Sequence, residues 1–263
     1  MASNMSCIGI TARDPQDFGR RMSLLLERSE PAGKVGGHEL RVWSDASGAS
    51  VSFVLSEDGV ECATPGFRAR SRLHARATRF ASDPDCRFCD PLLVEIVDAK
   101  GELFYPLATQ LEDLLLTRER GSEGAMLELG VCAFAHGLEV WADEAAFTSA
   151  QADEEVKFAT ESLIPAGLFS PEGQERPEAA EAFLTGRVLE AGLRENLATG
   201  ETFQHAIVRT LGGSYDVLAS PRELAAPLEP GNIIQGEFWL VGRVMSGLAE
   251  APRPGLMQRI FRA

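Results

Sequence analysis

Two cysteines separated by two residues are the side chains of this sequence best suited to chemistry. They lie in the segment Cys86-Arg87-Phe88-Cys89, and two thiolates at this spacing chelate Zn²⁺ or exchange with disulfides. A tetrahedral zinc site needs two further ligands, and the nearest candidates along the chain are Cys62 and His74. The sequence has no second CxxC motif, and Pro84 and Pro91 favour a loop over the strand-to-helix position of a thioredoxin-like motif.

Three interpretations of these cysteines follow. The pattern favours inert thiols. The second interpretation is a zinc site built from Cys62, His74, Cys86 and Cys89, and the third is a redox pair formed by the last two. No cofactor other than this zinc ion is expected.

Five arginines fall between positions 68 and 79. If this segment is one strand, alternate residues share a face, and that face carries Arg68, Arg70, Arg72, His74 and Arg76. We call this row the arginine ridge. Because guanidinium groups donate paired hydrogen bonds to phosphates and carboxylates, the ridge is a candidate surface for an anion or an acidic partner. Pairing with the chain's own acids is the simpler alternative.

Familiar catalytic motifs are missing from the sequence. It contains no HExxH, GxSxG, Walker A or GxGxxG pattern. Its four histidines are far apart along the chain, and its acids and serines are too numerous to single out a pair. We therefore nominate no catalytic residue, and a hydrolase or transferase site assembled from distant residues stays an alternative.

The overall composition limits the classes of partner. Of the 263 residues, 25 are Lys or Arg and 39 are Asp or Glu, so the formal charge is −14, which argues against general binding to nucleic acid or anionic membranes. The sequence lacks an apolar run of about 18 residues and a signal-peptide layout. Five scattered cysteines fit reduced thiols. We expect a cytoplasmic protein, and its excess of Arg over Lys is typical of bacterial genes of high GC content.

The apolar pattern predicts an α+β fold that is predominantly antiparallel β. Asp14 and Pro15 predict the start of a helix that ends near Arg28. Strands are expected over 38–43, 49–55 and 58–63, followed by a hairpin over 92–98 and 102–105. Leucine spacing after Pro106 predicts a helix over 106–118, whereas 125–134 fits either a strand or a helix.

One eight-residue segment recurs in the chain. Residues 38–45 and 136–143 are identical at five of eight positions, which include two of the three tryptophans. Both segments alternate apolar and polar residues, as half-buried strands do. The repeat predicts two related β-rich modules at 1–130 and 131–175, with a further strand over 155–163 in the second. A duplicated pair could hold a ligand groove between its copies or serve a purely structural role.

The last third of the chain predicts a separate β module over 182–247. Its four strands are expected at 185–194, 202–211, 214–219 and 233–244, with a short helical link before the last. This order resembles an OB-like small β-barrel. Residues 248–263 are expected to form a linker and an amphipathic tail.

These features favour a non-enzymatic intracellular interaction or adaptor protein that binds another protein through β-module surfaces. Nucleic-acid binding through the OB-like module is an alternative. It is weakened by a small supply of aromatic rings for base stacking, since residues 185–245 hold only Phe203, Tyr215, Phe238 and Trp239. The partner and the oligomeric state do not follow from the sequence.

Overall fold

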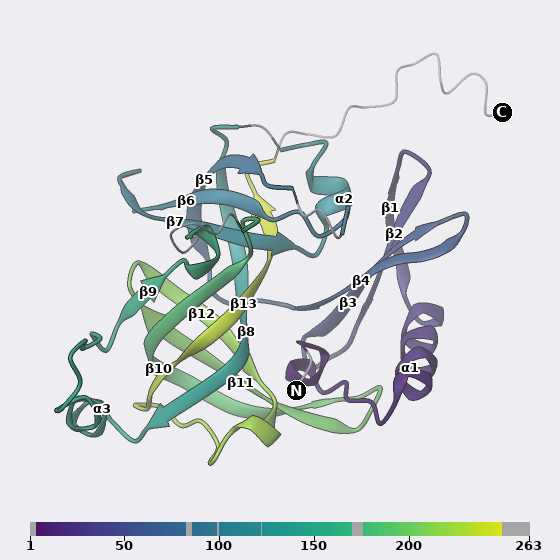
Figure 1. Cartoon of the computed structure of the whole chain (residues 1–263). Helices are drawn as coiled ribbons and strands as arrows, with labels where there is room; N and C mark the ends of the chain where they lie inside the picture. Colours follow the sequence, from purple (N-terminus) through teal and green to yellow (C-terminus); the bar gives the residue numbers. More distant parts are fainter. Residues whose placement is uncertain (1–3, 83–85, 99, 122, 170–175, 249–263) are drawn as a thin grey trace.

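The chain folds into two β-sheets with short helices beside them (Figure 1). The computed structural model describes residues 4–82, 86–98, 100–121, 123–169 and 176–248. Most of the strand pairs in these segments are antiparallel, so the predicted β-rich α+β class is confirmed. The predicted tail lies outside them, apart from Leu248. None of the helices in these segments is long and apolar enough to cross a bilayer.

The four-stranded sheet follows the N-terminal helix. Helix α1 (Pro15–Glu27) begins where predicted, because the Asp14 carboxylate caps it by accepting from the Asp17 N–H at 2.8 Å. Strands β1 (Glu30–Val35), β2 (His38–Ser44), β3 (Ala49–Ser56) and β4 (Gly59–Phe67) then pair in chain order as an antiparallel meander. The three strands predicted between 38 and 63 are therefore confirmed, and β1 adds an edge strand.

The nine-stranded sheet closes into two rings of five strands. The first ring consists of β5 (Leu73–Phe80), β6 (Leu92–Val97), β7 (Leu103–Leu111), β13 (Ile233–Ser246) and β8 (Met126–Trp141). The second consists of β10 (Glu181–Asn196), β11 (Glu201–Thr210), β12 (Gly213–Ala219), β8 and β13. Strand β9 (Ser162–Ile164) pairs with β10 outside the rings.

The two rings share their longest strands. Each ring starts with an antiparallel three-strand meander, and a short helix joins the meander to a long fourth strand: α2 (Leu114–Thr117) before β8, and the 3₁₀ helix η3 (Pro221–Glu223) before β13. The third strand of each meander pairs in parallel with the long strand that follows the other meander. Thus β7 pairs with β13, and β12 pairs with β8. These two parallel pairs close the two rings, so neither ring has an unpaired strand edge at this point.

Two hydrophobic cores hold the molecule together. The larger runs through both rings and includes Leu107, Leu129 and Leu240. The second lies between the four-stranded sheet, the N-terminal segment and the second ring, where Phe53 and Phe134 belong to one buried cluster. Since this second core draws on both sheets, it packs them against each other.

The helix predicted over 106–118 is wrong. Residues 103–111 form strand β7, and only Leu114–Thr117 is helical. Proline has no N–H group to donate, so it is tolerated where one side of a strand is unpaired. Pro106 is opposite Glu95 of β6 on one side, and on the other side β13 pairs with β7 only at Gln110 and Leu111. Residues 126–134 of the ambiguous segment 125–134 belong to strand β8.

The segment 131–175 contains the end of one long strand, one short helix and one short strand. Its first part is the end of β8, which belongs to both rings, and the strand expected over 155–163 is reduced to β9. Between them lies helix α3 (Glu144–Ala150), which the Asp143 carboxylate caps by accepting from the Ala146 N–H at 2.8 Å. The two copies of the repeat lie in different sheets, one in β2 and the other at the end of β8.

Four strands of the last third are confirmed, as β10 to β13. These four strands do not close a barrel by themselves, because β12 and β13 do not pair with each other. Strand β8, from the middle of the chain, lies between them and pairs with both. The predicted boundaries 182–247 therefore omit one strand of the ring.

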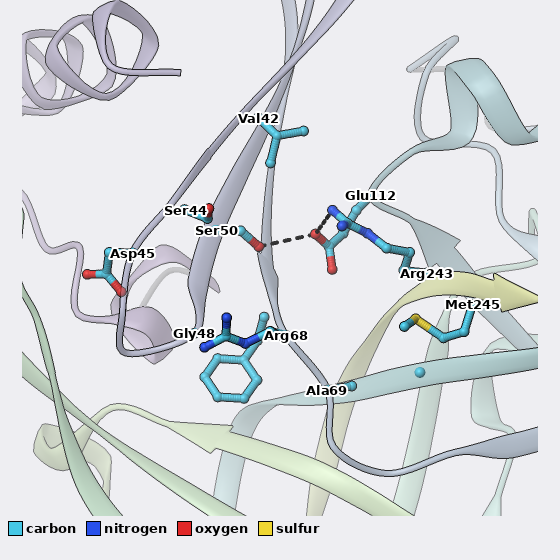
Figure 2. Close-up of a pocket in the computed structure, with 12 residues that line it drawn as sticks. Val42, Ser44, Asp45, Gly48, Ser50, Arg68, Ala69, Glu112, Arg243 and Met245 are labelled. Atoms are coloured by element: carbon cyan, nitrogen blue, oxygen red, sulfur yellow. Dashed lines mark hydrogen bonds and ion pairs between the residues drawn. The ribbon is translucent and has the colours of Figure 1, made fainter. Parts of the chain in front are cut away.

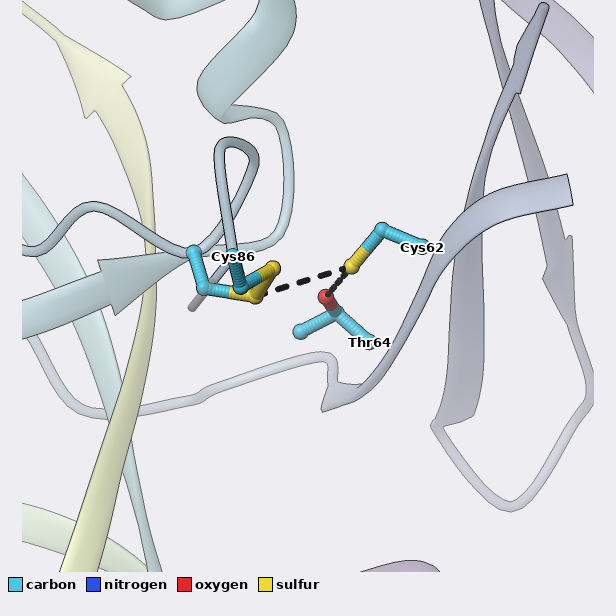
Figure 3. The surroundings of a disulfide bond; sticks show 4 residues. Cys62, Thr64 and Cys86 are labelled. Carbon is cyan, nitrogen blue, oxygen red and sulfur yellow. Dashed lines mark hydrogen bonds between the residues drawn. A yellow bond between two sulfur atoms is a disulfide. The ribbon is translucent and has the colours of Figure 1, made fainter. Parts of the chain in front are cut away.

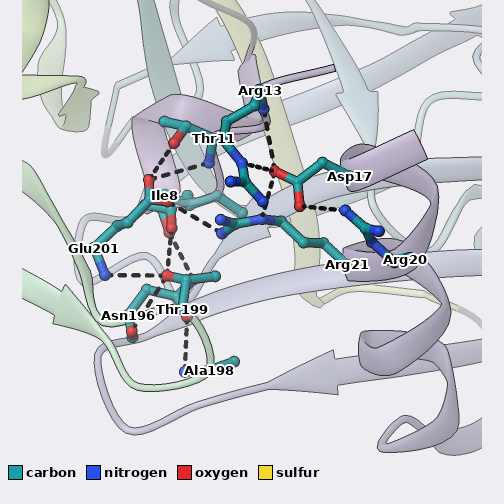
Figure 4. Close-up of polar contacts among 11 residues, drawn as sticks. Ile8, Thr11, Arg13, Asp17, Arg20, Arg21, Asn196, Ala198, Thr199 and Glu201 are labelled. Carbon is teal, nitrogen blue, oxygen red and sulfur yellow. Dashed lines mark hydrogen bonds and ion pairs between the residues drawn. The ribbon is translucent and has the colours of Figure 1, made fainter. Parts of the chain in front are cut away.

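The N-terminal segment is fastened to the hairpin between β10 and β11 (Figure 4). The Asn196 side-chain amide donates to the Ile8 carbonyl at 2.8 Å, and the Thr199 hydroxyl donates to the Gly9 carbonyl at 2.6 Å. Glu201 accepts from the Thr11 N–H at 3.2 Å. The chain start and the second ring are thus joined by local polar contacts as well as by the second core.

Candidate functional site

Three cysteines converge although Cys62 and Cys89 are 27 residues apart in sequence. The sulfur atoms of Cys62, Cys86 and Cys89 all lie within 4.8 Å of one another. Cys86 and Cys89 form a disulfide, and the Cys62 sulfur lies 3.8 Å from that of Cys89 and 3.6 Å from the Thr64 hydroxyl (Figure 3). We call these three cysteines the thiol cluster. Such a group of sulfur ligands could hold a metal ion.

His74, the fourth predicted zinc ligand, is not part of this cluster. It lies on β5 opposite Glu128 of β8, and its side chain is exposed. Successive side chains of a strand point to opposite faces. Because Leu73 and Ala75 fill the core of the rings, His74 points away from it. The fold thus brings together three of the four predicted ligands.

Two strands and one loop position the cluster. Cys62 belongs to β4, where it pairs with Val54 of β3. The loop before β6 carries the other two cysteines and turns through a hydrogen bond from the Cys89 N–H to the Cys86 carbonyl at 2.9 Å. Phe88 in this loop packs on His38 of β2, with ring centroids 5.0 Å apart. The loop is therefore held against the four-stranded sheet, beside Cys62.

The protonation of Cys62 differs from that of an exposed thiol. Burial raises its pKa, and the contact with the Thr64 hydroxyl only partly offsets this effect. The thiol therefore keeps its proton at neutral pH, which makes it a poor nucleophile towards the neighbouring disulfide. A metal ion removes this barrier, because a coordinated thiol is deprotonated.

Two cavities border the cluster. One of about 450 Å³ is lined by Cys62, Cys89 and Trp239 among others, and another of about 440 Å³ is lined by Cys89, Gln110 and the segment 176–181. Cys89, Gln110 and Trp239 contribute to both. An ion or a small molecule in either cavity therefore has access to a residue of the cluster.

The remaining cysteines serve the core. Cys7 and Cys132 are both buried in the second hydrophobic core, and their thiols donate to the carbonyls of Ala135 at 3.6 Å and Phe67 at 3.5 Å. Burial raises the pKa of Cys7 to about 12, and it raises that of Cys132 well above its usual range. These two thiols provide natural controls for the cluster.

The arginine ridge is not a single strand face. Strand β4 ends at Phe67 and β5 begins at Leu73, so Arg68, Arg70 and Arg72 lie in the connecting segment. The alternation is broken there because the chain leaves one sheet and enters the other.

Most of these arginines pair with acids of the same chain. Arg70 contacts Glu190 at 2.6 Å, Arg76 contacts Glu95 at 2.7 Å, Arg72 contacts Glu128 at 3.5 Å, and Arg79 contacts Glu178 at 2.6 Å. Each of these pairs is partly exposed and contributes little stability by itself. Arg68 differs from the others, because its guanidinium has no hydrogen bond or ion pair with any described residue.

Arg68 lies in a cleft of about 150 Å³ between the four-stranded sheet and the first ring (Figure 2). The cleft also contains Glu112, whose carboxylate accepts from the Ser50 hydroxyl and from the Arg243 guanidinium, each at 3.1 Å. Burial raises the pKa of Glu112, although the charge of Arg243 works against this effect. The sequence analysis did not identify Glu112 or Arg243. For Glu112 the reason is the incorrect helix over 106–118, because this residue directly follows strand β7.

A buried histidine–aspartate pair has a structural role. Arg194 donates to His205 Nδ1 at 3.1 Å. Since arginine only donates, the imidazole proton is on Nε2, which donates to Asp216 at 2.7 Å. The other Asp216 oxygen accepts the N–H groups of Arg70 at 2.9 Å and Ser71 at 2.8 Å. The pair thereby fastens the connecting segment to the second ring, and the lone pair of Nδ1 is occupied.

No protein-family model, curated protein or solved structure matches this chain. Its function has to be inferred from its own residues and their geometry. Among the described residues, the thiol cluster brings thiols together beside open space, and the Arg68 cleft does the same for charged groups.

Proposed function

We propose that this chain is a non-enzymatic interaction protein that binds a protein partner through its β-sheet surfaces and holds Zn²⁺ in its thiol cluster when reduced. The convergence of three cysteine sulfurs within 4.8 Å carries the metal part of the proposal. Two thiolates that bind one tetrahedral zinc ion at ~2.3 Å lie roughly 3.8 Å apart. The Cys62 and Cys89 sulfurs have this separation.

The thiol cluster has an oxidised and a reduced state. With the Cys86–Cys89 disulfide formed, only Cys62 retains a thiol. Reduction of the disulfide by a thiol reductant adds two electrons and two protons and yields three thiols. Zn²⁺ then displaces their protons. Three protein ligands leave the fourth coordination position to water or to a side chain of a partner.

A bound ion would cross-link two parts of the fold. Cys62 lies on β4, one of the two edge strands of the four-stranded sheet, and the other two cysteines lie in the loop before β6 of the first ring. Any ligand that binds only the folded state stabilises it. We propose that zinc fixes the loop on the sheet edge and so shapes the surface offered to the partner.

Zinc content measured under reducing conditions tests the metal part. We expect native mass spectrometry of the reduced, metal-replete protein to show one zinc ion per chain. The variants Cys62→Ala and Cys89→Ala should lose most of it, whereas Cys7→Ala, which removes a buried thiol outside the cluster, should retain it. Clearly substoichiometric zinc in the unaltered protein, or equal zinc in all variants, would show that the cluster is not a zinc site.

The second ring supports an alternative. We propose that the second ring is an OB-like barrel in which β8 supplies the strand that residues 182–247 lack. Such barrels bind nucleic acids through exposed aromatic rings. Of the aromatic rings on the five strands of the second ring, however, Phe134, Phe203, Tyr215 and Phe238 are buried, and the three partly exposed ones, Trp141, Phe183 and Trp239, each pack on another ring. This burial favours a protein partner over a nucleic acid.

Capture of binding partners distinguishes these alternatives. The tagged, reduced protein would be incubated with lysate of its host, with and without nuclease and with and without zinc. We expect a stoichiometric protein partner that survives nuclease and whose recovery falls in the Cys62→Ala variant. Recovery that nuclease abolishes would favour the OB-like alternative instead.

A further inference from the structure

The cleft around Arg68 forms a second candidate site, separate from the thiol cluster. The four-stranded sheet contributes Ser44, Ser50 and the turn at Asp45 to its lining, and the rings contribute Glu112 and Arg243 (Figure 2). The second hydrophobic core, which both sheets build, holds these two walls together. The cleft is therefore part of the folded structure.

Two guanidinium groups in this cleft have unused hydrogen-bond donors. Arg68 is exposed and makes no side-chain contact with an acid among the described residues, whereas the neighbouring Arg70, Arg72 and Arg76 all do. Arg243 uses one nitrogen on Glu112, and its Nε is buried without a partner. An unpaired buried donor costs free energy that a ligand oxygen can recover.

The acids of the cleft are already engaged. One oxygen of Glu112 accepts from both Ser50 and Arg243. The Asp45 carboxylate accepts from the N–H of Leu197 and from the N–H of Ser47, each at 2.8 Å. These bonds hold both carboxylates in place, and neither forms an ion pair with Arg68, which has no acidic partner among the described residues.

We infer that this cleft binds a small oxyanion, a phosphate or carboxylate group, at the guanidinium group of Arg68, with the guanidinium group of Arg243 as a second cation in the lining. Planar guanidinium groups match the oxygen pairs of both anions, and each charge-assisted hydrogen bond is stronger than a neutral one. The volume of about 150 Å³ suits one such group, and it is smaller than the pockets of ~300 Å³ or more that hold drug-sized ligands.

Calorimetric titration of the full chain with inorganic phosphate, and separately with malonate, tests this inference. Potassium chloride at matched ionic strength controls for screening, since a spherical ion cannot use the paired donors. We expect saturable binding of phosphate or malonate that weakens by about tenfold or more in Arg68→Gln. The matched control Arg79→Gln removes another exposed arginine, which does not line the cleft, and should bind like the unaltered protein.

A second variant separates loss of binding from loss of folding. Arg243→Lys keeps the positive charge beside Glu112 but removes the planar fork, so it should also weaken binding while the protein retains its thermal stability. The inference is overturned if Arg68→Gln binds phosphate and malonate as tightly as the unaltered protein does. It is also overturned if chloride produces the same heat as both oxyanions.

Discussion

Glu112 is a buried acid that is held in place by its immediate neighbours. Its carboxyl group packs on Gly66, where a Cβ atom would lie only 2.2 Å from the Glu112 Cδ. A residue larger than glycine at position 66 would therefore have to displace this carboxyl. Ser50 and Arg243 supply its hydrogen bonds. The carboxyl group is thus held in one place at the cost of removal from water.

The raised pKa of Glu112 predicts how stability changes with pH. The folded protein binds the Glu112 proton more tightly than the unfolded chain does. Protonated Glu112 therefore stabilises the folded state fully below the ordinary pKa of 4.5, and this stabilisation is lost as the pH rises through the pKa of the folded protein. In Glu112→Gln the side chain cannot ionise. We expect the melting temperature of the variant, relative to the unaltered protein, to rise by roughly 2–4 °C between pH 5 and pH 8.

Thermal unfolding followed by circular dichroism across this pH range provides the measurement. Glu95→Gln is the matched control, since Glu95 is a partly exposed acid paired with an arginine on the surface of the first ring. Parallel pH profiles for Glu112→Gln and the unaltered protein would contradict the assigned effect of burial.

Among the elements, helix α1 has the clearest electrostatic anchor. Asp17 in its first turn is surrounded by Arg13, Arg20 and Arg21 (Figure 4). Arg21 also reaches Glu201 at 3.1 Å on the β10–β11 hairpin. The helix is therefore linked through its own charges to the second ring.

Asp17 is expected to stabilise the folded protein only while its carboxyl group is ionised. The N–H of Arg13 and the guanidinium groups around it lower its pKa from 3.8 to about 2. The stabilisation is present above the ordinary pKa and is lost as the pH falls through the folded value. Asp17→Asn should thus lower the melting temperature at pH 7 by roughly 2–4 °C, and the difference should shrink towards pH 2.

Circular dichroism at several pH values would follow this effect. Asp58→Asn is the control, because Asp58 is an exposed acid in the turn between β3 and β4. A difference between Asp17→Asn and the unaltered protein that stays constant down to pH 2 would assign the effect to side-chain packing and not to charge.

At the scale of the whole molecule, the shared strands make the two rings interdependent. Strand β8 pairs with β5 through its first residues and with β12 through 132–134, and β13 likewise pairs with β10 and then with β7. The buried hydroxyls of Tyr105 and Tyr215 meet at 2.9 Å between the meanders of the two rings. One long strand cannot detach without opening both rings.

Fragments of the chain test this dependence. Residues 176–263 contain all four strands of the last third but lack β8, so β12 and β13 lose their common neighbour and the apolar interior opens to water. We expect this fragment to lack a cooperative unfolding transition, whereas 126–263, which restores β8, should unfold cooperatively in urea. Cooperative unfolding of 176–263 alone would show that the four strands form a stable unit without β8.

The local pattern of residues determined much of the secondary structure. Asp14 and Pro15 mark the start of α1, and the strands at 38–44, 49–56 and 201–210 lie within one residue of their predicted positions. These elements follow from capping chemistry and from apolar alternation, which act over a few residues. Where local signals conflicted, as at Pro106, tertiary pairing with β6 produced a strand in place of the predicted helix.

The candidate sites depended more on tertiary structure. CxxC spacing and the nearby Cys62 could be read from the chain, and so could the density of arginines. Only the packing of β4 beside the loop at 86–89 decided that Cys62 joins the cluster and that His74 does not. Likewise, only the passage of the chain between two sheets separated Arg68 from its paired neighbours. Such contacts join residues far apart in sequence, and periodicity carries no information about them.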